Sequence, residues 1–323
     1  MTVGMGNLYR RRVVANGSPS CPLCGNVSSN LSWMPSLSRY VILLLNLTTE
    51  SFTNVFEQTH ARNMSRIFWC PTGPFTFLPI HAAGFYDAWS SEPGHKVFDF
   101  VVSSYIPTLS ILANSPKSET ASPGGLRLLV VRQPLSNGQI PLPGVEAELE
   151  HIRAVIKNSL SARTILTESS VGTVEEVLSL MKDADWAHFA CHGVQDAASP
   201  TDSGLCLADQ RRLRVFDIIG LSRPHGGLAF LSACQTAKGD EDLSDEAIHI
   251  AAGMLFAGFA GVIGTMWSIS DKIAPNVAKE LFRNGTTPDY REAAQALQVA
   301  VGRLRDSSNV SFEDWLQFIH VGL

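Results

Sequence analysis

Two residues whose side chains could act together follow two predicted strands. The strand Trp186–Cys191 leads directly into His192, and the strand Gly227–Ala233 leads directly into Cys234. In an open α/β sheet, ligands bind beyond the carboxyl ends of the strands. If the two strands are neighbours, we expect the imidazole of His192 and the thiol of Cys234 to emerge at the same edge of the sheet.

A cysteine beside a histidine can hydrolyse a peptide bond. A free thiol with a pKa of about 8.5 is mostly protonated at neutral pH, so it needs a nearby imidazole to become a good nucleophile. His192 would withdraw the thiol proton of Cys234, or hold the thiolate as an ion pair, and then protonate the leaving amine. The backbone N–H groups of Gly193 and Cys234 are the candidate oxyanion donors. Loss of one such donor costs on the order of 10²–10³ in rate.

Each of these residues taken alone has a simpler interpretation. A single histidine at a strand end is more often structural than catalytic, and a cysteine after Ser-Ala is usually buried filler. We expect His188 to be packed within its strand or on a polar face. The other histidines also lack the setting of a strand followed by glycine: His60, His81, His95, His151, His225, His249 and His320.

Strands and helices alternate along the chain after a loop or linker at residues 115–125. Apolar runs predict strands at 126–131, 163–166, 186–191, 227–233 and 261–266. Helical periodicity predicts helices at 146–157, at 245–259, at about 274–283 and 289–305, and after the capping box Thr173–Glu176. This order favours an α/β fold with a mostly parallel sheet covered on both faces.

Three further segments have a predicted conformation. Residues 66–70 read as a strand, and the apolar run 77–81 extends this β-rich start. Residues 205–208 and 211–215 predict a small hairpin that turns at Asp209-Gln210 beside the candidate site.

The first 34 residues differ from the rest of the chain, and we expect them to be a loosely ordered tail because they lack sustained periodicity. Cys21-Pro-Leu-Cys24 in this tail is half of a zinc knuckle. No second Cys/His pair with ligand spacing follows nearby, and a structural zinc site needs four ligands. We therefore expect neither a metal nor a cofactor.

The composition bounds the class of protein. Hydrophobic residues make up 45% of the 323 residues, charged residues only 17%, and the formal net charge is −5, so we expect a globular protein that does not target nucleic acid or an anionic membrane. Six cysteines are too sparse for a disulfide scaffold. The amino-terminal residues lack the pattern of a signal peptide, and the run Tyr40–Leu45 is too short to span a bilayer. These features predict a reduced, cytoplasmic setting.

Several motifs in order resemble the CHAT domain family of caspase-like, separase-like cysteine peptidases, over residues 66–323 or so. The motifs are Trp69 to Ile80, Leu142-Pro-Gly-Val-Glu-Ala-Glu-Leu149, Ala190-Cys-His-Gly193, Leu231-Ser-Ala-Cys-Gln-Thr236, Leu243 to Gly253, Gly264-Thr-Met-Trp-Ser-Ile-Ser-Asp271 and Trp315 to Gly322. The resemblance implies a three-layer α/β/α caspase-hemoglobinase fold over 35–323, with an inactive half at about 35–125 and a catalytic half at about 126–323. It also implies the dyad of His192 and Cys234, which lie 234 − 192 = 42 residues apart.

The resemblance also suggests residues for substrate specificity and a mode of regulation, but with fewer matching motifs than for the fold and the dyad. In separase-like relatives an acid after the tryptophan of the next strand lines the first specificity pocket, so Asp271 and Ser268 are the candidates, and Asp271 would favour a basic P1 residue. Asp271 could instead cap the helix that follows it. The acidic run Asp240–Asp242 is a possible activation or substrate loop. The family is usually linked to tetratricopeptide repeats, and none is found here, so such a regulator would act in cis in a longer protein or in trans.

Three hypotheses for the function remain open at this stage. The first is a cysteine endopeptidase that cleaves a protein substrate, with a role in signalling or regulated cell death that comes from the family alone. The second is a catalytically silent interaction module that uses the cleft for binding. The third is a Cys-dependent amidase or acyl transferase on a doubly wound sheet.

Overall fold

The structure, a computed structural model, describes residues 64–84, 86, 95–113, 125–135, 139–158, 164–169, 171–196, 198–221, 223, 226–233, 250–267, 269–284, 290–307 and 310–323. The predicted tail at 1–34, the pair Cys21 and Cys24, and the acidic run Asp240–Asp242 lie outside these ranges.

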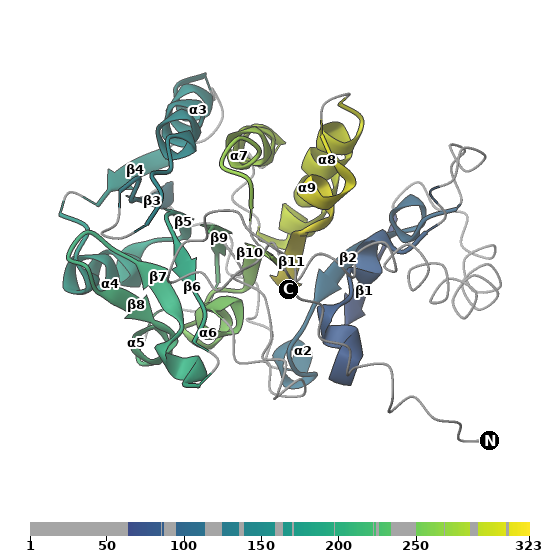
Figure 1. Cartoon of the computed structure of the whole chain (residues 1–323), viewed down its shortest axis with the longest axis horizontal. Helices are drawn as coiled ribbons and strands as arrows, with labels where there is room; N and C mark the ends of the chain where they lie inside the picture. The colour runs from purple at the N-terminus through teal and green to yellow at the C-terminus, as the bar shows by residue number, and fades with distance from the viewer. Residues whose placement is uncertain are drawn as a thin grey trace, which may run out of the picture.

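The described chain is built on one sheet of eight strands in the order β1-β2-β11-β10-β9-β5-β3-β4 (Figure 1). The strands are β1 (Ser65–Trp69), β2 (Val101–Tyr105), β3 (Leu126–Arg132), β4 (Thr164–Glu168), β5 (Trp186–Ala190), β9 (Leu228–Ser232), β10 (Gly261–Thr265) and β11 (Phe318–Gly322). Within this sheet the neighbouring strands are parallel except for β10 and β11. The prediction of an α/β fold with a mostly parallel sheet is confirmed.

Helices cover both faces of this sheet (Figure 1). One face packs against α3 (Gly144–Asn158), α7 (Ala274–Asn284), α8 (Ala293–Arg305) and α9 (Phe312–Leu316). The other packs against α4 (Val174–Asp183), α5 (Val215–Ile219) and α6 (Ile250–Phe256). A short helix, α2 (Ser110–Ala113), follows β2.

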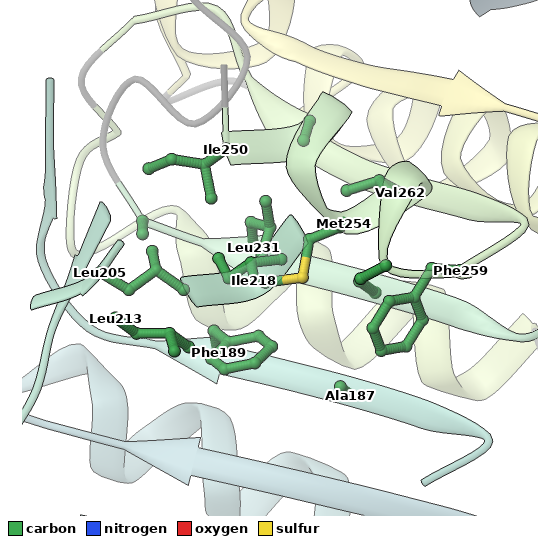
Figure 2. Packing of buried hydrophobic residues seen from close by; sticks show 14 of the residues in the cluster. Ala187, Phe189, Leu205, Leu213, Ile218, Leu231, Ile250, Met254, Phe259 and Val262 are labelled. Atoms are coloured by element: carbon green, nitrogen blue, oxygen red, sulfur yellow. The ribbon is translucent and has the colours of Figure 1, made fainter. Parts of the chain in front are cut away.

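Alternation along the central strands separates the two largest apolar clusters of the described residues, one on each face of the sheet. In β5, Ala187 and Phe189 pack into the cluster on the α4–α6 face, whereas Trp186 packs into the cluster on the α3–α9 face. In the first cluster Phe189 and Leu231 of the sheet lie close to Met254 of α6 (Figure 2). The side-chain period of two in a strand therefore gives every central strand two buried faces, as expected for a parallel sheet between helices.

Most predicted elements are confirmed within a residue or two. Thr173 caps α4, since its hydroxyl accepts the N–H of Glu176 at 3.3 Å, as the capping box predicted. The predicted hairpin is formed by β7 (Gly204–Cys206) and β8 (Arg212–Arg214), and with β6 (Gly193–Val194) it makes a separate three-stranded sheet. Gln210 in its turn takes the left-handed conformation with a φ of 64°.

Two predictions about elements were wrong. The apolar run 77–81 is not a strand: 3₁₀ turns occupy Gly73–Phe77 and Ile80–Ala82. Pro79 between them has no N–H to donate to a ladder, so the apolar residues enter the interior from turns instead. The predicted helix 245–259 runs on too far, because α6 ends at Phe256 and Gly258 has a φ of +109°. Residues 245–249 lie outside the described ranges.

Gly227 makes the entry into β9 possible. Its φ is +82°, and a Cβ placed there would lie 1.8 Å from the carbonyl oxygen of Asp185. We therefore expect Gly227→Ala to lower the free energy of unfolding by about 2 kcal/mol or more, through backbone strain and steric overlap. Chemical denaturation of the purified chain measures this change.

Gly302 in α8 provides the matched control. A Cβ at this position meets nothing within 4 Å, and the backbone is helical. Gly302→Ala should therefore raise the free energy of unfolding by about 0.5–1 kcal/mol. Equal effects of the two substitutions would contradict this account of β9.

Candidate functional site

The strands that precede the predicted dyad are adjacent and parallel. Their register runs from Trp186 opposite Leu228 to Ala190 opposite Ser232. His192 follows Ala190 by two residues, and Cys234 follows Ser232 by two residues. The predicted dyad requires that the two strands are neighbours and end at the same edge of the sheet, and β5 and β9 meet this condition. Cys234 lies outside the described residues, so the distance between the two side chains stays untested.

His192 is held by a backbone carbonyl from the segment that connects β3 to α3. The ring is buried, with 7% of the residue exposed, and Nε2 lies 2.8 Å from the carbonyl oxygen of Ile140. A carbonyl oxygen only accepts, so Nε2 carries a hydrogen and donates it. In the neutral ring Nδ1 is then the nitrogen that can take up a proton. Sequence analysis missed Ile140, because a backbone carbonyl has no residue type to recognise.

The small sheet anchors the backbone of the His192-Gly193 segment. The N–H of Cys206 in β7 donates to the carbonyl of His192 at 2.8 Å, and Gly193 pairs with Leu205. Bonded and non-bonded pairs alternate in an antiparallel ladder, so the N–H of Gly193 points away from β7. Gly193 is therefore free of the ladder bond that would otherwise remove it as an oxyanion donor.

Two side-chain hydrogen bonds fix the carboxyl end of β9. The hydroxyl of Thr265 in β10 donates to the carbonyl of Ala233, the residue before Cys234, at 2.9 Å. The hydroxyl of Ser232 donates to the carboxylate of Glu148 on α3 at 2.6 Å. All three of Thr265, Ser232 and Glu148 are buried, so these bonds form away from water.

The structure also places His188, which we expected to be packed, and Asp271, a candidate for substrate binding. His188 is fully buried among aromatic rings, which confirms that it is a packed residue. The carboxylate of Asp271 accepts the N–H of Gly144, the first residue of α3, at 2.7 Å, so it caps α3. A Cβ on Gly144 would lie 2.2 Å from the Asp271 carbonyl oxygen, which explains the glycine. Ser268 lies outside the described residues.

Two histidines outside the predicted dyad join separate parts of the fold. His81 donates from Nε2 to the carbonyl of Leu316 at 2.9 Å, and its Nδ1 accepts the hydroxyl of Tyr105 at 2.8 Å. Burial lowers the pKa of His81 to about 4. Burial, and to a lesser degree the positive charge of Arg66, lowers the pKa of His320 well below its ordinary value.

Among the residues that the structure describes, no group of three or more His, Cys, Asp and Glu side chains is arranged to hold a metal ion. Within the same ranges, no helix combines the length and the apolar character that crossing a membrane requires.

Comparisons with known proteins identify the fold. The sequence profile of the CHAT domain family matches residues 33–323. No match to the chain was found among curated protein sequences.

Three solved structures illustrate the likeness. The Arg-specific cysteine proteinase gingipain R superposes with a TM-score of 0.54 at 10% identity, over 89% of this chain and 67% of that one. The complex of the Porphyromonas gingivalis RgpB pro- and mature domains gives 0.53 at 10% identity, over 89% and 68%. A Saccharomyces cerevisiae separase–securin complex gives 0.51 at 14% identity, over 87% of this chain. The chain spans only 17% of that separase chain, and 14% in a second structure of the complex.

The low pKa of His81 makes the stability of the fold depend on pH. The pKa of His81 is about 6.5 in the unfolded chain, whereas in the fold the ring stays neutral to about pH 4. Between these two pH values the unfolded state therefore binds more protons than the folded state. The contribution of the neutral His81 to the free energy of unfolding is fully present above about pH 6.5 and is lost as the pH is lowered towards 4. His320, whose pKa is shifted in the same direction, adds to the loss. We expect the melting temperature to fall between pH 7 and pH 5, on the order of several degrees, in a thermal scan.

His81→Gln is the control for this effect. A glutamine can donate its amide N–H to Leu316 and accept the hydroxyl of Tyr105, but it does not titrate. The variant should lose part of the pH dependence between pH 7 and pH 5. A melting temperature of the wild-type chain that is constant over this interval would contradict the prediction.

Proposed function

The chain belongs to the CHAT domain family, and from this premise we propose that it is a cysteine endopeptidase in which His192 is the base and Cys234 the nucleophile. The observation that carries the proposal is the hydrogen bond from Nε2 of His192 to the Ile140 carbonyl. His192 lies just beyond the end of β5, and β5 pairs with β9, the strand that leads to Cys234. A ring held in this way is oriented and keeps one tautomer, with Nδ1 left to accept a proton.

Chain connectivity limits the distance between the His192 ring and the Cys234 thiol. Cys234 follows Ala233 directly, and consecutive Cα atoms are about 3.8 Å apart. The Thr265 hydroxyl holds the Ala233 carbonyl, so the nucleophile starts from a fixed point beside β5. A loop that continues the register of β5 and β9 by two residues would bring Cys234 level with His192.

The reaction follows from these roles in two halves. His192 takes the thiol proton of Cys234, and the sulfur attacks the peptide carbonyl carbon to give an oxyanion that faces the N–H groups of Gly193 and Cys234. The C–N bond then breaks, the proton passes from His192 to the leaving amine, and a thioester remains. In the second half His192 takes a proton from water, the water oxygen attacks the thioester, and the C–S bond breaks to release the carboxylic acid and restore the thiol.

The substrate that we propose is a protein with a basic P1 residue, which Asp271 would recognise. The structural neighbour gingipain R is described as Arg-specific, and a carboxylate that faces the pocket would favour such a residue. Asp271 uses one oxygen for Gly144, and its other oxygen would face the substrate. We propose a cytoplasmic enzyme of signalling or regulated cell death, governed by a tetratricopeptide-repeat regulator in cis or in trans.

Replacement of the dyad tests the proposed function. We expect Cys234→Ala and His192→Ala each to lower kcat/KM for a cleaved peptide on the order of 10³-fold or more, because each removes a group that the reaction cannot replace. Turnover of a fluorogenic peptide library measures this. Cys70→Ala, which removes an exposed thiol beyond the end of β1, should leave cleavage unchanged. Cleavage that survives Cys234→Ala would rule out this nucleophile.

Asp271 allows a test of specificity that separates its two roles. Asp271→Asn keeps an oxygen for the N–H of Gly144 but loses the charge, so we expect the melting temperature to hold while cleavage after Arg and Lys falls about tenfold. Asp271→Ala should in addition lower the free energy of unfolding by about 1 kcal/mol, through loss of the cap on α3. Unchanged cleavage by Asp271→Asn would assign the residue to the cap alone.

A further inference from the structure

A carboxylate lies inside the core at a position where the helix pattern calls for an apolar residue. The buried face of α3 carries Val145, Leu149 and Ile152, and Glu148 falls within this face, three residues after Val145. Only 1% of Glu148 is exposed. An ionised group removed from water costs several kcal/mol unless its partners compensate, and such a departure from a local rule is expected where a function requires it.

The partners of this carboxylate come from the two central strands. One oxygen of Glu148 accepts the hydroxyl of Ser232 at 2.6 Å. The other lies 3.7 Å from Nε2 of His188, within the range of an ion pair but beyond that of a hydrogen bond. Neither ring nitrogen of His188 has a hydrogen-bond partner among the described residues, and the rings of Phe230 and Phe282 flank it.

Each of the three segments that meet at this carboxylate also carries part of the candidate site. Ser232 is the last residue of β9 and precedes Cys234 by two residues in the sequence, and His188 in β5 precedes His192 by four. Glu148 itself follows Ile140 by eight residues, and α3 begins between the two. A shift of α3 along the sheet would therefore move the Ile140 carbonyl relative to the ring of His192.

We propose that Glu148 is a positioning residue for the base. Its carboxylate fixes α3 against β5 and β9, so that the Ile140 carbonyl stays within hydrogen-bond reach of Nε2 of His192 and the neutral ring keeps the Nε2–H tautomer. An apolar side chain would pack α3 on the sheet without fixing its position along the strands, because dispersion contacts are not directional, whereas a hydrogen bond is. The proposal rests on the proposed function for its catalytic meaning, but its structural content can be tested alone.

The tautomer of His192 is the direct measurement. The sample is the full chain with Cys234→Ala, labelled with ¹⁵N-histidine, at about pH 8, where an ordinary imidazole is neutral. We expect the ring nitrogens of His192 to show the Nε2–H tautomer alone. A second sample adds E148L and S232A, which replace the carboxylate with an apolar side chain and remove the hydroxyl that would lose its partner. We expect His192 in this sample to show a mixture of both neutral tautomers. Replacement of a buried polar pair by apolar groups is often neutral for stability, so the melting temperature should hold. A merely structural role for Glu148 would not move the tautomer.

Two further variants keep the test decisive. Glu146→Gln, two residues away on α3 and exposed, should leave the single tautomer intact. If the double variant does not fold, Ser232→Ala decides, because it removes only the hydroxyl that one oxygen of Glu148 accepts. A single Nε2–H tautomer in every folded variant at positions 148 and 232 would overturn the proposal.

Kinetics on the chain with an intact Cys234 links the positioning role to catalysis. Loss of orientation should lower kcat for a cleaved peptide by about tenfold or more and leave KM unchanged, since binding is not altered. An unchanged kcat in a variant with mixed tautomers would overturn the link to catalysis. Retained cleavage in Cys234→Ala would instead refute the proposed function. The tautomer measurement would still test the positioning role of Glu148 independently.

Discussion

The pairing of β5 with β9 is the constraint on which the candidate site depends. A slip of one residue would turn every side chain of one strand to the opposite face. Packing forbids such a slip, because Ala187 and Phe189 fill one apolar cluster while Trp186 fills the other. The position of His192 relative to the end of β9 is thus set by large hydrophobic side chains well inside the sheet.

Much of the fold could be predicted from local patterns, and the strand order could not. Apolar runs bounded by polar turns located β3, β5, β9 and β10, because a strand buried on both faces needs such a run. The place of β11, at the end of the chain yet between β10 and β2, depends on pairing between distant segments. The run 77–81 has the apolar composition of a strand, but Pro79 cannot donate to a ladder, so composition alone predicts the wrong structure there.

The candidate site divides in a similar way. His192 could be found because the predicted strand 186–191 ends directly before it and glycine follows, and neighbouring strands bring such ends together. The Ile140 carbonyl and the contact between Asp271 and Gly144 could not be found, since the first is a backbone atom and the second joins residues 127 positions apart. Helix periodicity shows that Glu148 falls on the buried face of α3, but not that Ser232 and His188 would meet it there.

Buried polar side chains of the central strands gather on one face of the sheet. Alternation along the strands places His188, Ser232 and Thr265 on the face of α3 and α7, whereas the opposite cluster is composed of apolar side chains. Apolar packing tolerates exchange of residues of similar size, so the face of α4 to α6 could change its sequence while the fold persists. Polar groups in the core tolerate less, because a lost partner leaves an unpaired atom in a medium of low polarity. A fold shared at 10–14% identity is consistent with this division, in which the architecture depends on hydrophobic pattern and the geometry of the strand ends depends on a few buried hydrogen bonds.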